Sequence, residues 1–317
     1  MILITEDVWG AQFEGLRALD EVCYEPDLWN RREAMKEKLR NATVLVVRNR
    51  TKVDAELIAA SPNLKLICRA GVGLDNIDLS AADAREIAVS AALGVNAISV
   101  AEHTLGLALA LARNIITHDL QTESGKWIRT PGMELRGKTW GMLGFGATAQ
   151  CTATLLQGFG VNKIAYDPYA KFSDSQLQSF GVELVSLDSV IEKSDIISVH
   201  LPHTPATKNL LNAAEFSRMK KGVLIVSVGR GEVIDETDLI AALKSGHLGG
   251  AALDVRASEP PTIGELELFE NVILTPHIAG ITHESQSAIL ELLAADIMSS
   301  YTGAELRGAV GKIRSIS

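Results

Sequence analysis

The chain has 317 residues, of which 47% are hydrophobic and 22% charged. This length suits two domains, and this balance excludes a mainly disordered chain. The formal net charge of −9 argues against broad binding to nucleic acid or to an anionic membrane, because both need a basic surface. A small anionic substrate stays compatible with that charge, since a local basic pocket can override it.

The cysteines are Cys23, Cys68 and Cys151, and their wide spacing fits neither a zinc site nor a disulfide framework. We therefore expect no bound metal. The first residues lack the basic start and apolar run of a signal peptide. The longest apolar stretch, 105–112, is flanked by polar residues and predicts a buried helix rather than a membrane span. We expect a cytoplasmic protein.

Short apolar runs alternate with helical patterns from the N-terminus onward. Three runs predict strands of a first α/β unit: Ile2–Thr5, Val44–Val47 and Leu64–Cys68. Six later runs predict a second series: Thr139–Leu143, Lys163–Tyr166, Ile196–His200, Val223–Val228, Ala251–Val255 and Val272–Leu274. Continuous apolar strands separated by helices are typical of a parallel sheet covered on both faces.

The predicted boundary between the domains is Asn96–Ser99. Ser99-Val100-Ala101-Glu102 matches a capping box, which predicts a helix from there to about Asn114. A further helical segment, Glu284–Ser300, is expected to cross back to the first domain, with no strand–helix alternation after it. The prediction is an α/β protein in which residues 99–283 are inserted between 1–98 and 284–317.

A glycine-rich turn follows the predicted strand Thr139–Leu143 and opens a helical pattern. Its residues are Gly144, Phe145, Gly146, Ala147, Thr148 and Ala149. The two glycines allow a tight turn and close approach of backbone amides to a pyrophosphate, which the helix N-terminus attracts. Asp167 ends the next strand, 21 residues after Gly146. A carboxylate there bonds ribose hydroxyls and repels a 2′-phosphate, so NAD is expected rather than NADP.

Three polar residues each follow a later predicted strand: Arg230, Glu259 and His277. Removal of a hydride from a 2-hydroxy acid needs a cation for the carboxylate, a proton acceptor for the hydroxyl and a group that tunes this acceptor. Arg230 can grip a carboxylate and His277 can exchange a proton near neutral pH. Glu259, if bonded to the imidazole, favours its protonated form and fixes its orientation. Each alone has an ordinary structural explanation, but together they predict a catalytic site.

Over nearly its whole length the chain resembles the D-isomer-specific 2-hydroxyacid dehydrogenase family. The resemblance is carried by Arg69–Asp78, by Ser99–Thr104, by the glycine turn and by the Arg, Glu and His segments in order. It implies two Rossmann-like parallel-sheet domains, with an NAD-binding domain (99–283) inserted into a substrate-binding domain. It also implies an NAD-dependent D-2-hydroxyacid dehydrogenase, and a homodimer built through the NAD-binding domain with the Ser99–Asn114 region contributing.

The resemblance also implies roles for single residues. Arg230 binds the substrate carboxylate and polarises the carbonyl, His277 is the acid/base, and Glu259 is its partner. The backbone at Val72 and Gly73 meets the substrate carboxylate. Asp254 holds the nicotinamide carboxamide; the other implied cofactor contacts are Leu201, Pro202, Thr207, Val228 and Gly280. The chain departs from the family at Ala147-Thr148, where Arg-Ile is frequent, and at Ala149, where Gly is usual.

Arg48 follows the second predicted strand, in a stretch similar to the D-3-phosphoglycerate branch of the family, where a basic residue meets the substrate phosphate. A second anionic group on the substrate would form a favourable ion pair with the Arg48 guanidinium. A basic residue in a solvated loop is an equally ordinary explanation of Arg48. Hydroxypyruvate or glyoxylate reduction and sulfolactate oxidation stay open, as does a role as an NAD-sensing transcriptional corepressor. Since the chain ends soon after its last predicted helix, we expect no regulatory domain.

Six histidines remain outside the predicted chemistry. His103 is expected to pack or cap the helix between the domains, and His203 to border the cofactor site at most. The others are His118, His200, His247 and His283.

Overall fold

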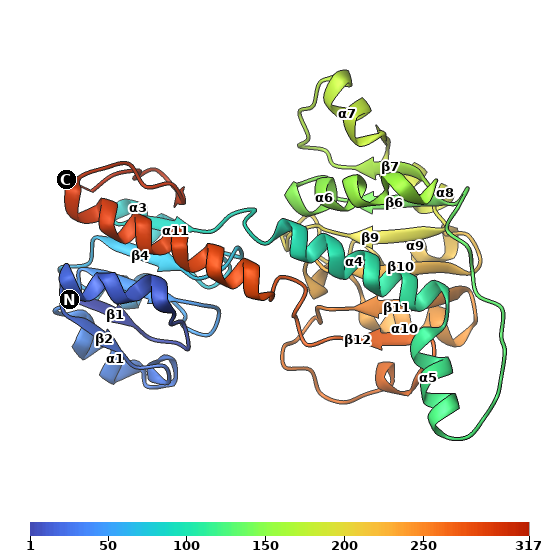
Figure 1. Cartoon of the computed structure of the whole chain (residues 1–317), viewed down its shortest axis with the longest axis horizontal. Helices are drawn as coiled ribbons and strands as arrows, with labels where there is room; N and C mark the ends of the chain where they lie inside the picture. Colours follow the sequence, from blue (N-terminus) through green and yellow to red (C-terminus); the bar gives the residue numbers. More distant parts are fainter. Residues whose placement is uncertain (317) are drawn as a thin grey trace. The chain divides into compact units, whose positions relative to one another are not determined.

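The computed structural model describes residues 1–316, which form two compact units (Figure 1). One unit contains residues 1–96 and the chain from 281 onward, and the other contains residues 97–280. In chain order, the second unit is therefore inserted into the first. Each unit has its own mostly parallel sheet and its own apolar cores, so the predicted α/β class is confirmed.

The sheet of the first unit has the strand order β13-β5-β4-β3-β1-β2. Its strands are β1 (Ile2–Ile4), β2 (Val22–Tyr24), β3 (Val44–Val47), β4 (Leu66–Arg69), β5 (Ala88–Ala91) and β13 (Ala309–Val310). All neighbours pair in parallel except β13, which is antiparallel to β5. The apolar residues of β1 and β3 are buried throughout, because both faces of the sheet are covered.

Helices cover each face of this sheet. They are η1 (Ala11–Ala18), η2 (Leu28–Asn30), α1 (Arg32–Leu39), α2 (Ala55–Ala59), α3 (Leu79–Ala84) and α11 (His283–Thr302). Phe13 of η1 and Leu293 of α11 belong to one apolar core, whereas Leu39 of α1 and Leu57 of α2 belong to the other. The unit therefore has three layers, with the sheet in the middle.

The sheet of the second unit has the order β12-β11-β10-β9-β6-β7-β8, and every pair is parallel. Its strands are β6 (Thr139–Leu143), β7 (Asn162–Tyr166), β8 (Val182–Leu184), β9 (Ile196–Val199), β10 (Val223–Ser227), β11 (Leu248–Leu253) and β12 (Val272–Leu274). The chain runs outward from β6 to β8, returns to β9 beside β6, and then runs outward to β12. Open α/β sheets bind ligands at such a reversal of strand order.

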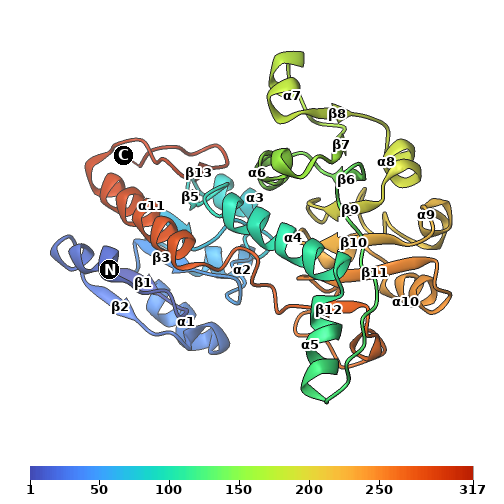
Figure 2. The same ribbon diagram turned by 45° about the vertical axis from the view of Figure 1, so that its right-hand side comes forward.

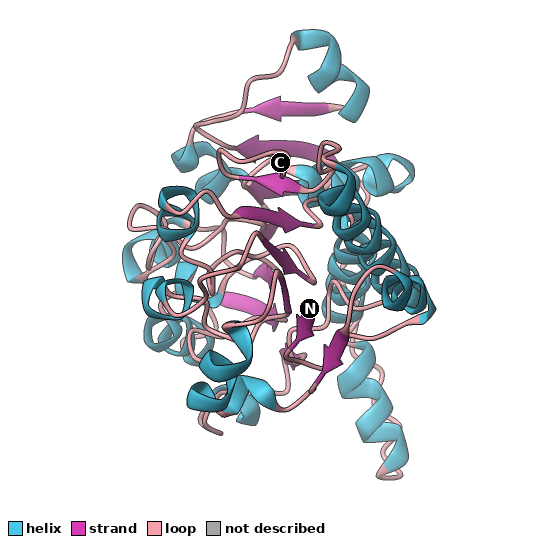
Figure 3. Cartoon of the chain, turned by 90° about the vertical axis from the view of Figure 1, so that its left-hand side faces the viewer, coloured by secondary structure: helices cyan, strands magenta, loops and turns pink. Residues whose placement is uncertain are grey.

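The helices of this unit are α4 (Ala97–Ala112), α5 (Ile115–Glu123), α6 (Ala147–Leu155), η3 (Leu156–Phe159), α7 (Asp174–Phe180), α8 (Leu187–Lys193), α9 (Ala213–Arg218), η4 (Gly231–Val233), α10 (Glu236–Lys244) and η5 (Leu266–Leu268). One core contains side chains of α4 and α6, and the other contains side chains of α8, α9 and α10. Figure 3 shows helices on both sides of the strands, and Figure 2 shows α5 extending away from the sheet of this unit. None of the helices in residues 1–316 combines the length and apolar character needed to span a bilayer.

All nine predicted strands are present, with ends displaced by at most three residues. Four short strands, β2, β5, β8 and β13, were not predicted, because their two to four residues carry little apolar pattern. β13 follows α11 as a single short strand, and within residues 1–316 no helix comes after it, in agreement with the expectation that the strand–helix alternation ends there. The predicted capping box at Ser99 is wrong, since α4 begins at Ala97 and Ser99 lies buried inside it.

Candidate active site

The candidate active site lies along one edge of the seven-stranded sheet. Because its strands run parallel, the loops that follow β6, β7, β9, β10, β11 and β12 all leave the sheet at this edge. Every sequence-predicted site residue of the second unit lies in one of these loops or at the start of α6. Arg48, Val72 and Gly73 belong to the first unit.

The glycine turn connects β6 to α6 around the switch in strand order. Gly144 has a φ of +86°, and a Cβ atom there would lie 3.2 Å from Leu201 and 3.3 Å from the His200 backbone. Gly146 precedes α6, and a Cβ atom there would meet nothing within 4 Å. The space beside Gly146 is thus open, and the first amides of α6, at Ala147 and Thr148, have no acceptor within the helix. This arrangement fits a diphosphate.

Asp167 follows β7 and supports the same turn. Its Oδ2 atom accepts the Phe145 amide at 2.9 Å, and its Oδ1 atom accepts the Tyr169 amide at 2.9 Å. Each carboxylate oxygen has a second lone pair, so the group can still accept hydrogen bonds from a sugar. The carboxylate therefore shapes the turn as well as carrying the charge expected to select the dinucleotide.

The loop after β9 packs tightly against the loop after β10. A Cβ atom on Gly229 would lie 2.5 Å from the Leu201 carbonyl oxygen, so only glycine fits there. Thr207 closes the turn after Leu201 by donating to the Pro202 carbonyl at 2.6 Å. Val228 is buried beside these residues. The predicted adenosine-side residues therefore lie on a firmly held backbone.

His200 is a residue of this edge that sequence reasoning missed. Its Nδ1 atom lies 3.2 Å from the Thr148 hydroxyl, and its Nε2 atom lies 3.0 Å from Ser198 Oγ, which also accepts from Trp140 Nε1. Burial lowers the pKa of His200 to about 4, so the ring is neutral at physiological pH. It links the start of α6 to the sheet. No motif marks such a residue.

Glu259 and His277 form a hydrogen-bonded pair. His277 Nδ1 lies 2.7 Å from Glu259 Oε2, and Glu259 Oε1 accepts the Arg256 amide at 3.0 Å. Burial raises the pKa of Glu259, but the bonds from His277 and from the Arg256 amide outweigh this and leave that pKa below its usual value. Among residues 1–316, His277 Nε2 has no hydrogen-bond partner. This nitrogen can therefore exchange a proton with a ligand.

The backbone of His277 adopts the left-handed region, with a φ of +55°, which non-glycine residues rarely occupy. Its amide donates to the Asp254 and Thr275 carbonyls at 2.8 and 3.0 Å. These bonds fix a conformation that costs about 1 kcal/mol or more. The fixed backbone of His277 and the hydrogen bond to Glu259 therefore both orient the imidazole.

Asp254 is buried and holds the turn that carries His277. Its carboxylate accepts the Thr275 hydroxyl at 2.5 Å and the Ile278 and Ala279 amides at 2.9 and 2.8 Å. Burial raises the pKa of Asp254, but bonds from His103, Thr275 and the two amides lower it below its usual value. The turn ends at Gly280, the last residue of the second unit.

His103 lies in the middle of α4, so of its two expected roles, packing and capping, capping is excluded. Its Nε2 atom is 3.2 Å from the Thr275 hydroxyl and 3.5 Å from Asp254 Oδ1. The sequence motif around Ser99–Thr104 therefore supplies a side chain to the network behind His277.

Arg230 follows β10 and directly precedes η4. Its Nη1 atom donates to the Gly229 carbonyl at 2.9 Å. At the next position, a Cβ atom on Gly231 would lie 2.0 Å from the Arg256 carbonyl carbon. The loop that carries Arg230 and the loop that carries Glu259 are therefore in direct backbone contact.

Arg256 was not assigned a role from sequence, yet it anchors the Glu259 loop. Its guanidinium donates to Glu236 at 3.0 Å and to Glu267 at 2.9 Å, and Glu236 also accepts the Ala257 amide at 2.8 Å. The two glutamates come from α10 and η5, far apart in sequence, so no local pattern could have revealed this cluster.

In the first unit, the sequence-predicted substrate residues follow neighbouring strands. Arg48 comes directly after β3, and Val72 and Gly73 come shortly after β4. Within residues 1–316, the Val72 and Gly73 amides have no hydrogen-bond partner, which suits a backbone that receives a carboxylate.

Comparison with known proteins gives one family match. Residues 105–279 match the family described as "D-isomer specific 2-hydroxyacid dehydrogenase, NAD binding domain". This segment contains the glycine turn and the loops of the candidate catalytic residues.

Individual relatives extend the similarity to most of the chain. The D-3-phosphoglycerate dehydrogenase of Archaeoglobus fulgidus is 43% identical over 88% of this chain and 53% of its own length. A glyoxylate reductase from Paecilomyes thermophila is 30% identical with a TM-score of 0.89, covering 98% and 97% of the two chains. The D-mandelate dehydrogenase of Rhodotorula graminis is 28% identical with a TM-score of 0.90, covering 100% and 99%. The chain spans about half the length of its curated relatives, at 53% and 48% for two of them.

Proposed function

The chain belongs to the D-isomer specific 2-hydroxyacid dehydrogenase family, and on this premise we propose that it transfers a hydride between NAD and C2 of a D-2-hydroxy acid or its 2-oxo acid. The observation that supports this most is the Glu259–His277 pair at the same sheet edge as the glycine turn. The insertion of residues 97–280 fits an NAD-binding domain placed within a substrate-binding domain.

The second unit has residues that fit the cofactor. The open space at Gly146, the amides of Ala147 and Thr148, and the Asp167 carboxylate suit the diphosphate and the adenosine ribose. Leu201, Pro202, Thr207 and Val228 suit the adenosine side, and Asp254 and Gly280 suit the nicotinamide side. The nicotinamide held there would supply the hydride acceptor for oxidation, and its reduced form the hydride donor for reduction.

His277 moves the proton. In oxidation, neutral Nε2 accepts the proton of the C2 hydroxyl, and in reduction the imidazolium returns it to the carbonyl oxygen. Glu259 holds Nδ1 at 2.7 Å and stabilises the positive charge that the ring gains. The left-handed backbone fixes the direction of the ring. Proton transfer therefore occurs from a preset position.

Arg230 supplies the positive charge that a 2-oxo acid needs. Its guanidinium binds the substrate carboxylate and polarises the C2 oxygen, so it acts on both the ground state and the transition state. In the first unit, the Val72 and Gly73 amides also suit a carboxylate.

For the substrate, we propose an acid with a second anionic group, such as 3-phosphoglycerate. Arg48 supports this, because within residues 1–316 its guanidinium has no carboxylate partner. The similarity to the Archaeoglobus D-3-phosphoglycerate dehydrogenase points the same way. Glyoxylate or hydroxypyruvate is the alternative, which the similarity to a glyoxylate reductase favours.

The test is a steady-state assay that follows NADH absorbance. The purified chain is given NAD with 3-phosphoglycerate, D-lactate and sulfolactate, and NADH with hydroxypyruvate and glyoxylate. We expect the highest kcat/KM for the phosphorylated acid. Turnover only with uncharged-tail acids contradicts the second anionic group, and no turnover with any 2-hydroxy or 2-oxo acid contradicts the dehydrogenase activity.

A further inference from the structure

Glu6 is a buried carboxylate with an unusual set of partners. It is 3% exposed and accepts hydrogen bonds from four consecutive backbone amides. Oε1 accepts from Arg48 and Thr51 at 2.8 and 2.9 Å, and Oε2 accepts from Asn49 and Arg50 at 3.2 and 3.0 Å. Bonds to an ionised acceptor are about twice as strong as neutral ones. One side chain thus determines the path of the whole Arg48–Thr51 loop.

The loop lies where three neighbouring strands end. β4, β3 and β1 are adjacent and parallel, so their carboxyl ends meet at one edge of the first sheet. Glu6 follows β1, Arg48 follows β3, and Val72 and Gly73 follow β4. Asn76 Nδ2 joins the last two segments by donating to the Arg48 carbonyl at 3.2 Å and to the Thr51 carbonyl at 2.8 Å.

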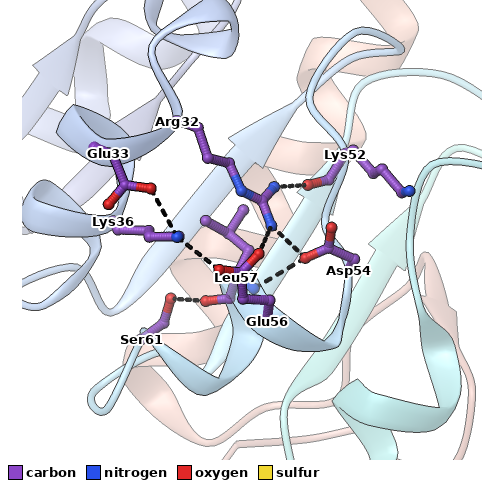
Figure 4. A network of polar contacts seen from close by, with 8 residues as sticks. All are labelled: Arg32, Glu33, Lys36, Lys52, Asp54, Glu56, Leu57 and Ser61. Atoms are coloured by element: carbon purple, nitrogen blue, oxygen red, sulfur yellow. Dashed lines mark hydrogen bonds and ion pairs between the residues drawn. The ribbon is translucent and has the colours of Figure 1, made fainter.

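Further contacts hold the loop at its downstream end. The Arg50 guanidinium lies 5.0 Å from the centre of the Trp29 ring. Arg32 donates to the Lys52 carbonyl at 2.7 Å and pairs with Asp54, which caps α2 through the Leu57 amide (Figure 4). Figure 4 also shows the Lys52 side chain extending away from this network. The loop backbone is therefore held at several points, whereas the Arg48 side chain forms no ion pair within the part of the chain that the structure describes.

We propose that Glu6 is a positioning residue that sets the preference for a second anionic group on the substrate. It acts through the four amides, which aim Arg48 at the distal group while Asn76 keeps Arg48 in register with the Val72–Gly73 backbone. This inference rests on the proposed function and adds to it the residue that decides specificity.

Glu6→Gln keeps the size of the side chain and changes only its capacity to accept the hydrogen bonds that position the loop. A glutamine has one acceptor oxygen, and each Glu6 oxygen serves two amides, so two of the four amides lose their acceptor in either orientation. Asn76→Ala removes the two side-chain hydrogen bonds to the Arg48 and Thr51 carbonyls. Asn76 is less buried than Glu6, so this variant can still be measured if Glu6→Gln does not fold. Asp296→Asn is the matched control, since Asp296 is also buried in the first unit and accepts the Arg307 and Gly308 amides.

The experiment measures KM for 3-phosphohydroxypyruvate and for hydroxypyruvate, which differ only in the phosphate. The preference is the KM for hydroxypyruvate divided by the KM for 3-phosphohydroxypyruvate. We expect Glu6→Gln and Asn76→Ala to lower this ratio about tenfold, equivalent to about 1.4 kcal/mol. The kcat on hydroxypyruvate should change little. Asp296→Asn should keep the wild-type ratio. An unchanged ratio in Glu6→Gln, or an equal change in Asp296→Asn, overturns the inference.

Amide hydrogen exchange provides a readout that does not need turnover. Amides 48–51 should be protected in the wild type and should exchange about tenfold faster in Glu6→Gln, the change expected for about 1.4 kcal/mol. Unprotected amides in the wild type contradict the hold of Glu6 on the loop. If amides 48–51 are protected but the wild-type chain turns over neither acid, the proposed function is contradicted. The role of Glu6 in substrate specificity is then overturned as well.

Discussion

His277 Nδ1 lies 2.7 Å from Glu259 Oε2, so the only ring nitrogen left for a ligand is Nε2. Because the pKa of Glu259 lies below its usual value, this carboxylate is ionised over the neutral pH range. Over that range the negative charge of Glu259 therefore lies beside the imidazole. The consequences for the proposed chemistry can be measured.

Glu259→Gln should move the pH profiles of reduction and of oxidation in the same direction, toward lower pH. The substitution removes the anionic neighbour of the ring, which disfavours the charged imidazole that reduction uses and favours the neutral imidazole that oxidation uses. The measurement is kcat/KM against pH in both directions. Glu265→Gln, which removes a surface partner of Lys244, is the control. Profiles that move apart, or do not move, contradict the pairing.

His277→Ala should lower kcat by about 10²–10⁴-fold and leave the Kd for NADH nearly unchanged, because the ring serves proton transfer. Arg230→Ala should instead raise KM and lower kcat together, since its charge acts in both ground and transition states. Stopped-flow turnover and NADH fluorescence titration distinguish the two patterns. Near-normal turnover of His277→Ala would mean that another residue supplies the proton.

Asp167→Asn should narrow the preference for NAD over NADP. The asparagine keeps an oxygen that can accept the Phe145 amide but removes the charge that repels a 2′-phosphate. Asp167→Ala removes both, and should weaken the binding of either dinucleotide. Kd values for NADH and NADPH, measured for the three proteins, give the comparison. An undiminished preference in Asp167→Asn shows that charge is not the selector.

His200 should make the second unit sensitive to acid. Its pKa is lowered to about 4, so the unfolded chain binds a proton first as pH falls below about 6.5. The stability that the neutral ring contributes is complete above that pH and declines toward pH 4. By pH 4.5 the loss is at most about 2.5 kcal/mol, because the ring keeps some contact with solvent.

His200→Gln should therefore lose less stability than the wild type between pH 7 and 4.5. Urea titrations at both pH values give the free energies of unfolding. His283→Gln controls for the removal of any histidine. Equal pH dependence in the wild type and His200→Gln contradicts a neutral, partly buried ring in the folded protein.

The second unit should form a homodimer. Ile116, Leu120, Trp127 and Ile128 are 45–83% exposed on and after α5, and such exposed apolar groups usually mark an interface. Light scattering should give twice the chain mass of 34.0 kDa at micromolar concentration. Leu120→Lys with Trp127→Glu should give monomers, whereas Ile263→Lys, at an equally exposed site elsewhere, should not. A wild-type monomer refutes the dimer.

Sequence alone predicted the parts of the fold that depend on long apolar strands. The strands β3 and β6 were predicted with their observed ends; β3 is buried throughout, and β6 is buried after its first residue. The start of α4 was misplaced, since Ser99 matches a capping pattern although the helix begins two residues earlier. A local pattern cannot exclude a start that tertiary packing favours.

The candidate site also contains residues that sequence motifs predicted and residues that they did not. Gly146, Asp167 and His277 stand at fixed positions after strands, so motif and order predicted them. Glu6 and His200 could not be predicted in this way. Glu6 acts on a loop more than forty residues later in the chain, and His200 is recognised only by its buried partners. Residues that support other residues leave little pattern of their own.

Gly231 has a consequence for anyone who redesigns this protein. Because even a methyl group there would collide with the Arg256 backbone, neither loop can move closer to the other at this point while its neighbour stays in place. A library that varies position 231 is therefore expected to displace the loop that carries Glu259. Changes in the reaction are reached more readily through the loops after β1 and β3, where backbone amides converge on a single side chain and one substitution alters the whole segment.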